Sequence, residues 1–147
     1  QSLQSDDKET MPMATTRREA VAECEDDLFC GVNTPKATDP ANMSDLEKKH
    51  VPVITAPDSV KKGECFDVAV EVGKHKAHPS DPDHFINFVE LYADHRYLGR
   101  AHFSHTTMCP VVKFCVQLDH IHKELRAFEW CNIHGTWEGV RPLEVTE

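Results

Sequence analysis

The sequence contains no apolar run of about 18 residues, the length that a membrane-spanning helix needs. It also lacks an excess of positive charge, because 16 lysine and arginine residues stand against 25 aspartate and glutamate residues, for a formal net charge of -9. General electrostatic attraction does not hold so acidic a chain on nucleic acid. We therefore expect no membrane and no nucleic-acid partner, and instead a small diffusible substrate or a protein partner.

The chain shows neither an internal repeat nor a glycine-rich phosphate-binding loop, and it has no basic leader followed by an apolar segment. It begins at Gln1 rather than methionine, which fits either a removed leader or a trimmed chain. A length of 147 residues with 39% hydrophobic composition predicts one domain with its own core, plus appendages.

Residues 1–45 are expected to form an extension in front of that domain, which then spans 46–147. Residues 1–14 are polar and lack periodicity, so we expect them to be disordered. A capping-box pattern and apolar residues four apart predict a short amphipathic helix over 16–30. A connector containing proline and asparagine follows at 32–45.

Beyond the extension, the hydrophobic pattern changes to a period of two, which is typical of half-buried strands. Apolar residues occupy every second position of 66–72 and of 111–118. Turn-like breaks separate seven strand-like runs, at 51–55, 66–72, 85–93, 97–105, 111–118, 124–130 and 139–146. The sequence therefore predicts an all-β fold, an antiparallel β-sandwich of about seven strands with a short N-terminal helical extension.

Ten histidines are many for a domain of this size, and three of them, His75, His78 and His84, lie in the segment 73–85. Two prolines in this segment exclude a regular helix and disfavour a strand, so we expect a loop between strands. Imidazoles on a loop held by a rigid sandwich are well placed to bind a metal. The alternative is a solvated histidine-rich loop without a ligand.

Two other segments add candidate ligands. His50 stands just before an apolar run, and Cys131 and His134 lie three positions apart at the end of an aromatic strand, where Gly135 lets the backbone turn sharply. A thiolate and an imidazole at this spacing can face one ion. The candidate metal ligands are His50, His78, His84, Cys131 and His134, with His75 as a spare.

The ligand types narrow the choice of metal. Four imidazoles and one thiolate exceed the four ligands of a structural zinc site, and one thiolate is too few for an iron–sulfur cluster. Five protein ligands on an ion that prefers six leave one position open, which favours a mononuclear iron with redox chemistry. Zinc remains compatible with the ligand types.

At these residues the sequence resembles the superoxide reductases, which include neelaredoxin and the catalytic domain of desulfoferrodoxin. The resemblance covers roughly residues 45–147. Three motifs carry it, in the same order and with strands between them: KHVPVI at 49–54, GKHKAHPSDPDHFI at 73–86 and CNIHGTWE at 131–138.

The resemblance implies an immunoglobulin-like sandwich that holds one iron ion per chain, Fe2+ or Fe3+. It implies equatorial ligation by His50, His78, His84 and His134, axial ligation by Cys131, and a catalytic role for Lys49. The implied reaction is the one-electron reduction of superoxide to hydrogen peroxide, with electrons from a rubredoxin-like or other protein donor. The family default for localisation is the cytoplasm, or the periplasm if a leader preceded Gln1.

The sequence departs from the family beside the first histidine. Many members read Glu-Lys-His there, and their glutamate binds the oxidised iron as a sixth ligand. Here the order is Glu47-Lys48-Lys49-His50, so Lys48 holds the usual position of the glutamate. We expect the ferric site to be open or capped by water or hydroxide, with Glu47 and Lys48 as neighbours of the site. The alternative is that the loop rearranges and Glu47 binds the iron as a sixth ligand.

The cysteines mark a second departure. Desulfoferrodoxins carry a small domain in which four cysteines bind another iron, whereas only Cys24 and Cys30 precede the catalytic domain here. Two thiols cannot build a tetrahedral site within one chain, so we expect a one-iron protein. Cys24 and Cys30 form a disulfide or pack as small hydrophobic residues, and we expect the other three cysteines outside the motifs, at 65, 109 and 115, to be buried.

Two other functions stay open at this stage. A non-catalytic iron-binding or electron-transfer module could use the same sandwich, and so could a structural domain stapled by zinc. Because small sandwiches with exposed edges commonly associate, we also expect a homo-oligomer, a dimer or a tetramer.

Overall fold

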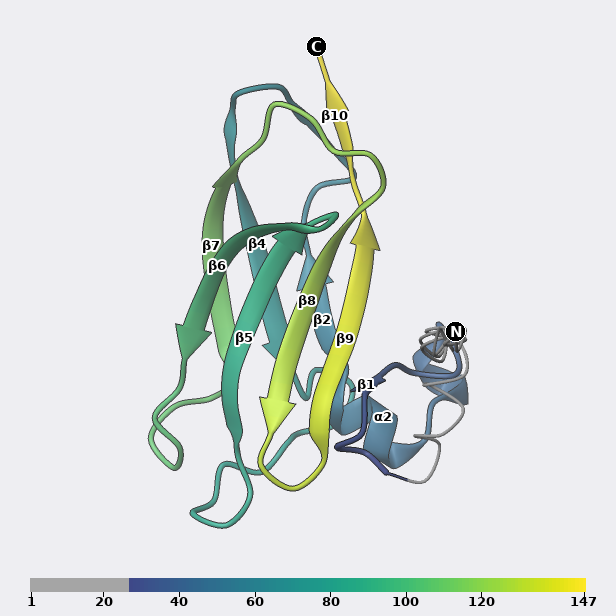
Figure 1. Cartoon of the computed structure of the whole chain (residues 1–147), viewed down its shortest axis with the longest axis vertical. Coiled ribbons are helices and arrows are strands. Elements are labelled where there is room, and N and C mark those ends of the chain that lie inside the picture. The colour runs from purple at the N-terminus through teal and green to yellow at the C-terminus, as the bar shows by residue number, and fades with distance from the viewer. Residues whose placement is uncertain (1–26) are drawn as a thin grey trace, which may run out of the picture.

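The computed structural model describes residues 27–147, which fold into a two-sheet β-sandwich (Figure 1). A five-stranded sheet in the order β1-β9-β8-β5-β6 packs on a three-stranded sheet, β2-β4-β7, and β3 pairs separately with β10. The described strands are β1 (Val32–Asn33), β2 (Pro52–Thr55), β3 (Ser59–Lys61), β4 (Cys65–Val72), β5 (Ile86–Ala93), β6 (Arg96–His102), β7 (Val111–Gln117), β8 (Glu124–Cys131), β9 (Gly135–Pro142) and β10 (Glu144–Thr146). The predicted β-sandwich is confirmed.

The core lies between the two sheets and follows from the period-two pattern. Val68 and Val70 of β4 are fully buried and share one hydrophobic cluster with Leu91 of β5 and Leu125 of β8. Removing each such side chain from water contributes roughly 1.5–3 kcal/mol. This packing fixes the sheets in place, so the loops at their ends start from rigid positions.

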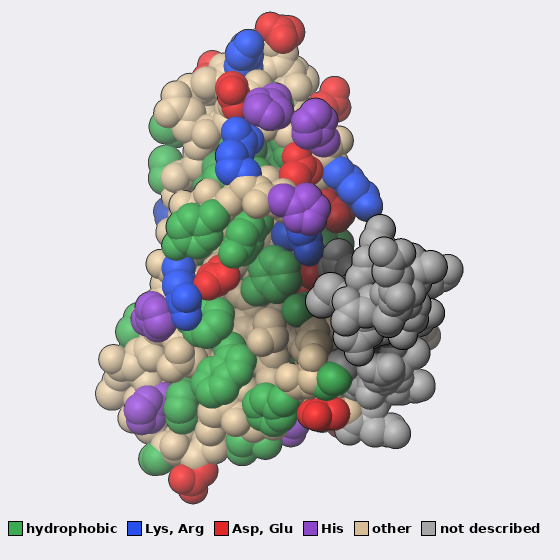
Figure 2. Space-filling view, in the orientation of Figure 1, with side chains coloured by type: hydrophobic (Ala, Val, Ile, Leu, Met, Phe, Trp, Pro, Cys, Tyr) green, Lys and Arg blue, Asp and Glu red, His purple; other side chains and the backbone are tan. Residues whose placement is uncertain are grey.

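The outer face of the five-stranded sheet carries hydrophobic side chains among charged ones, as Figure 2 shows. Arg100 lies over the ring of Phe88, 3.8 Å from its centroid, and Arg126 lies over Phe128 at 5.3 Å. Arg126 also donates two hydrogen bonds to the carboxylate of Glu138. The guanidinium groups therefore cover part of the aromatic surface that points away from the core.

The strand predictions hold except at the C-terminal end. Each of the seven predicted runs contains a strand, but the run 139–146 divides into parts of β9 and β10. Pro142 ends β9 because proline has no N–H to continue the ladder, and the chain then leaves to pair in parallel with β3. β1 and β3 were not predicted, since two or three residues are too few to show a period.

The extension reaches the sandwich through residues that the sequence assigned to a helix and a connector. Residues 16–26 of the predicted helix lie outside the described residues, and 27–30 form a turn in which the Cys30 N–H donates to the Asp27 carbonyl. β1 pairs in parallel with β9, so part of the connector is bound to the sheet edge. Within the described part of the chain, no helix has the length and apolar character to span a membrane.

Candidate metal centre

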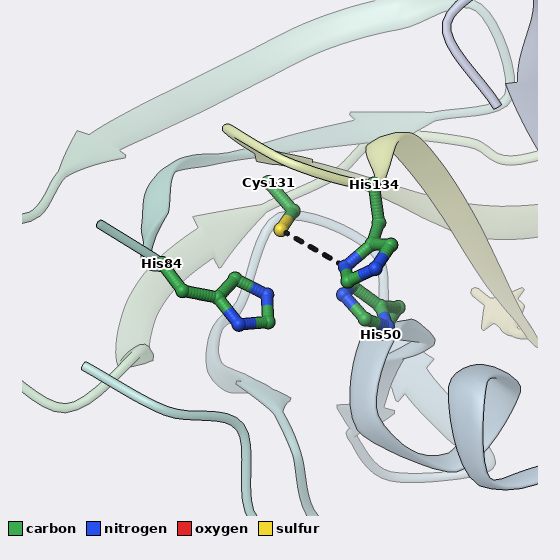
Figure 3. Close-up of side chains that lie close together, drawn as sticks. All are labelled: His50, His84, Cys131 and His134. Carbon is green, nitrogen blue, oxygen red and sulfur yellow. Dashed lines mark hydrogen bonds between the residues drawn. The ribbon is translucent and has the colours of Figure 1, made fainter. Parts of the chain in front are cut away.

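Four side chains from separate segments meet at one end of the sandwich. His50 ends α2 (Asp45–His50), His84 precedes β5, Cys131 ends β8, and His134 lies in the turn between β8 and β9. Their ligand atoms all lie within 4.8 Å of one another, and Figure 3 shows the side chains gathered around a common point. Atoms this close can all bond one ion at distances of about 2.0–2.3 Å.

His78 completes the group that the sequence proposed. Its Nε2 atom lies 3.6 Å from the Cys131 sulfur, and its ring centroid lies 4.8 Å from that of His50 and 4.5 Å from that of His84. The His134 Nδ1 atom lies 3.8 Å from the same sulfur. All five candidates are therefore brought together, with the sulfur beside at least two imidazoles, whereas His75 is half-buried and is not part of the cluster.

The short helix α2 positions His50, and the sequence prediction missed it. Ser44 and Glu47 form a capping box, in which the Ser44 hydroxyl accepts from the Glu47 N–H and the Glu47 carboxylate accepts from the Ser44 N–H. His50 Nδ1 donates to the Leu46 carbonyl at 2.7 Å, one turn earlier. The His50 ring also stacks on Trp137, with centroids 5.3 Å apart. These contacts turn Nε2 toward the centre.

The loop between β4 and β5 holds His78 and His84. It begins at Gly73, whose positive φ of 86° suits glycine. A Cβ at this position would lie 2.7 Å from the backbone nitrogen of His78. His78 Nδ1 donates to the Pro79 carbonyl at 2.6 Å, and two backbone hydrogen bonds join Asp81 to His84. The loop predicted from its prolines is thus an ordered platform.

A side-chain amide ties this loop to the turn that carries Cys131 and His134. The Asn132 amide donates to the Asp83 carbonyl at 2.8 Å and accepts from the Phe85 N–H at 2.8 Å. Gly135 follows with φ of 79°, as its place in the turn predicted, and a Cβ there would lie 2.2 Å from the Leu28 carbonyl oxygen. The two ligand segments are therefore held in one register.

Burial sets the protonation of the candidate ligands. It lowers the pKa of His50 and of His78 to about 4, and a hydrogen bond to a backbone carbonyl opposes this shift in both. Burial likewise raises the pKa of the Cys131 thiol. At neutral pH the imidazoles are uncharged, which is the form that binds metal, and the thiol gives up its proton when a metal binds.

The donor set fits a metal ion better than a closed hydrogen-bond network. The Nε2 atoms of His50 and His84 are buried and have no hydrogen-bond partner among the described residues. Leaving buried polar atoms unpaired costs free energy, and a bound ion removes that cost. Imidazoles with one thiolate suit iron, so this is a His/Cys metal site consistent with iron.

The charge of Lys49 affects the pKa of two candidate metal ligands. Burial is the main cause of the lowered pKa of His84 and of His134, and the Lys49 ammonium adds to the shift in both. Lys76 forms an ion pair with Asp45 at 2.7 Å. Lys74 donates to the Thr55 hydroxyl at 3.4 Å.

The Glu47 carboxylate is engaged away from the centre. One oxygen accepts from the Ser44 N–H at 3.1 Å and the other from the Lys36 N–H at 2.6 Å. These bonds lower the pKa of Glu47, although partial burial opposes the shift. Lys48, which follows it, interacts with Asp45 at the start of α2.

Sequence reasoning missed two residues next to the ligands. One is Asn132, whose side-chain amide joins the two ligand segments. The other is Glu129, which lies two positions before Cys131 on the buried side of β8. Glu129 is fully buried, neither carboxylate oxygen has a described hydrogen-bond partner, and burial raises its pKa well above the ordinary value. The alternation of side chains along β8 places Glu129 on the core side. A glutamate is normally expected at the surface, so no signal in the sequence indicated its burial.

The remaining cysteines correct one expectation. Cys65, Cys109 and Cys115 are exposed free thiols rather than buried ones, because each occupies an outward strand position or a loop. Cys30 is disulfide-bonded, and its pairing with Cys24 stays a prediction. Cys24 lies outside the described residues.

The fold and the site together define a β-sandwich protein with a His/Cys metal centre at one end. Comparisons with known proteins find relatives of this class. The sequence profile of the family described as Desulfoferrodoxin matches residues 42–140. A putative superoxide reductase of Methanocaldococcus jannaschii is 39% identical over 113 residues, covering 75% of this chain and 90% of the relative. A superoxide reductase of Pyrococcus abyssi is 39% identical over 106 residues, covering 66% and 89%.

Solved structures show the same relationship. The superoxide reductase (neelaredoxin) from Ignicoccus hospitalis superimposes with a TM-score of 0.66 at 32% identity, covering 78% of this chain and 95% of that one. The chain belongs to the desulfoferrodoxin and superoxide reductase family, as the three sequence motifs indicated.

Proposed function

We propose that this chain is a superoxide reductase with one mononuclear iron per chain, held by His50, His78, His84 and His134 and by the Cys131 thiolate. The observation that carries the proposal is the convergence of these donors within one partly buried cluster. Bound there, iron supplies a one-electron reductant for superoxide, and a thiolate ligand raises its electron density. Family membership supports the same reaction.

The protein side chains have three tasks in this reaction. Lys49 attracts the superoxide anion to a protein whose net charge of -9 otherwise repels it. Its ammonium also delivers protons through water to the reduced oxygen species. The third task is to leave a coordination position of the iron free for the substrate. The Glu47 carboxylate would not occupy that position, because it accepts hydrogen bonds from the Ser44 and Lys36 N–H groups.

The overall reaction joins superoxide, one electron and two protons to give hydrogen peroxide. Because no second superoxide is oxidised, another molecule must return the electron, and we propose a rubredoxin-like or other small redox protein as donor. A dimer or tetramer remains our prediction for the assembly, and residues 1–45 remain the proposed extension.

The test combines metal analysis with product analysis. Purified protein is expected to contain iron and, when oxidised, to show a visible charge-transfer band from thiolate to ferric iron. With an electron donor in excess, each superoxide consumed should yield one hydrogen peroxide and no oxygen. A colourless zinc protein, or oxygen release at the dismutation ratio, would overturn the proposal.

A further inference from the structure

Two exposed thiols lie next to each other on the outer face of the three-stranded sheet. Strands β4 and β7 are antiparallel, with Asp67 opposite Cys115 and Cys65 opposite Gln117. Cys65 and Cys115 are therefore diagonal neighbours on one face, and both are exposed. The two thiols are close enough for Cys65 to raise the pKa of Cys115.

We propose that Cys65 and Cys115 form a redox-active pair that hydrogen peroxide converts to an intramolecular disulfide. The pair is distinct from the metal centre. Cys65 begins β4, whereas the loop that carries two of the candidate metal ligands follows Val72 at the opposite end of the same strand. That the protein itself produces this hydrogen peroxide rests on the proposed function, because hydrogen peroxide is the product of the proposed reaction.

The reaction balances without another reagent. The Cys65 thiolate attacks one peroxide oxygen, the O–O bond breaks, and the departing hydroxide takes a proton to become water, leaving a sulfenic acid. The Cys115 sulfur then attacks the Cys65 sulfur, the S–O bond breaks and a second water leaves. Two thiols lose two electrons in total, and one peroxide gains them.

The surroundings assign the order of the two thiols. Desolvation is the largest effect that raises the pKa of Cys115, the Cys65 thiol and the Asp67 carboxylate add to it, and Lys113 opposes it. A raised pKa leaves less thiolate on Cys115 to attack peroxide, so we assign the first step to Cys65 and the second to Cys115, which resolves the oxidised Cys65. Asp67 and Lys113 form an ion pair at 3.6 Å beside the pair.

The strand geometry makes this disulfide easy to reduce again. Diagonal neighbours in an antiparallel sheet have Cα atoms roughly 7–8 Å apart, beyond the usual disulfide range of about 4.4–6.8 Å. Closing the bond therefore requires a local backbone shift in β4 or in β7, which is the edge strand of its sheet. A strained, exposed disulfide has a higher reduction potential than a structural one, so the pair can cycle.

The experiment treats the reduced full-length chain with hydrogen peroxide and maps its cysteines by mass spectrometry without reduction. Cys65 and Cys115 should disappear together into one linked peptide within a single chain, and dithiothreitol should release it. Cys109 provides the matched control, since it is also an exposed free thiol, and Cys109→Ser should leave the link intact. Cys65→Ser and Cys115→Ser should each abolish it.

Three results would overturn the proposal: no Cys65–Cys115 link, links that join two chains, or loss of Cys109 as fast as loss of the pair. A second arm supplies superoxide and an electron donor in place of peroxide. Superoxide also dismutates spontaneously to peroxide, so the intact chain should form the link faster than the Cys131→Ser variant, and catalase should suppress it in both. If added peroxide forms the link but superoxide forms it no faster in the intact chain than in the variant, the proposed function fails and the cysteine pair stands.

Discussion

Three of the imidazole residues at the metal centre are oriented by what their other atoms contact. Nδ1 of His50 and of His78 donates to a backbone carbonyl, so Nε2 is the nitrogen left for a metal. Trp137 supports two ligands at once, because it stacks on His50 and its indole N–H donates to the His134 carbonyl at 3.0 Å. Contacts within the protein thus orient these ligands.

Replacing Lys49 by glutamine should slow the reaction with superoxide by roughly threefold to tenfold at low ionic strength, and by less at high ionic strength. The physical reason is the loss of a positive charge that acts on the site. Pulse radiolysis measures the rate. Lys48→Gln is the matched control, because it removes the same net charge one residue away, and equal effects of both changes would remove Lys49 from the mechanism.

Replacing Cys131 by serine should abolish the visible band of the oxidised protein, since the band requires a thiolate bound to ferric iron. Absorption spectroscopy with metal analysis checks this. Cys109→Ser, which changes an exposed thiol, should leave the band unchanged. A band that survives in the Cys131 variant would show that another ligand produces it.

Replacing Glu129 by leucine should raise the free energy of unfolding by about 1–3 kcal/mol, because it removes a buried carboxyl group whose oxygens lack described partners. Glu129→Gln keeps the shape and a polar group, so it should gain less. Denaturant unfolding of both variants, in the same metal state, measures the difference. Destabilisation by leucine would mean that the carboxyl group has a partner in the native protein.

At the scale of secondary-structure elements, turns hold the strands in register. The turn between β5 and β6 contains Asp94, with a positive φ of 51°. Its carboxylate accepts from the backbone N–H groups of His122, Lys123 and Glu124, just before and at the start of β8. Partial burial acts to raise the pKa of Asp94, but these bonds outweigh it and lower the pKa below 3.8.

The Asp94 carboxylate should stabilise the fold by about 1–2 kcal/mol at neutral pH. Because its folded pKa lies below its unfolded pKa, this stabilisation is fully present above the unfolded value and is lost as pH falls through the folded value. Asp94→Asn tolerates the positive φ but lacks the charge. The difference in unfolding free energy between wild type and variant should therefore shrink below about pH 4, and a constant difference would contradict this account.

At the scale of the whole molecule, the metal centre joins segments that are far apart in the sequence. Its candidate ligands come from α2, the loop before β5, the end of β8 and the turn before β9. A bound ion therefore links both sheets of the sandwich at one end. The hydrophobic core lies between the sheets and includes residues such as Val68 and Leu91 that do not depend on the ion.

Removing the metal with a chelator should lower the melting temperature, because an ion that binds only the folded state stabilises it in proportion to the logarithm of its concentration over Kd. Circular dichroism should still show the β-sandwich. Calorimetry before and after refilling with iron measures the shift. An unchanged melting temperature in fully metal-free protein would contradict the proposed linkage of the segments.

Much of the fold and of the site follows from local sequence. Alternation in 66–72 and 111–118 predicts strands because side chains of a strand point to opposite faces. Prolines around His78 and His84 predict a loop, and the spacing of Cys131 and His134 predicts a half-site. The Ser44-x-x-Glu47 pattern would have predicted α2 as well, since a capping box is also a local signal.

The sequence by itself determined the strands, the ligand types and the family. Only the tertiary structure decided that the ligand segments share one end of the sandwich, that Glu47 binds the Lys36 N–H instead of facing the centre, and that Cys65 and Cys115 lie side by side on an exposed face. The physical reason is that strand register and sheet packing join residues distant in the chain, and no local period records which partner each residue meets.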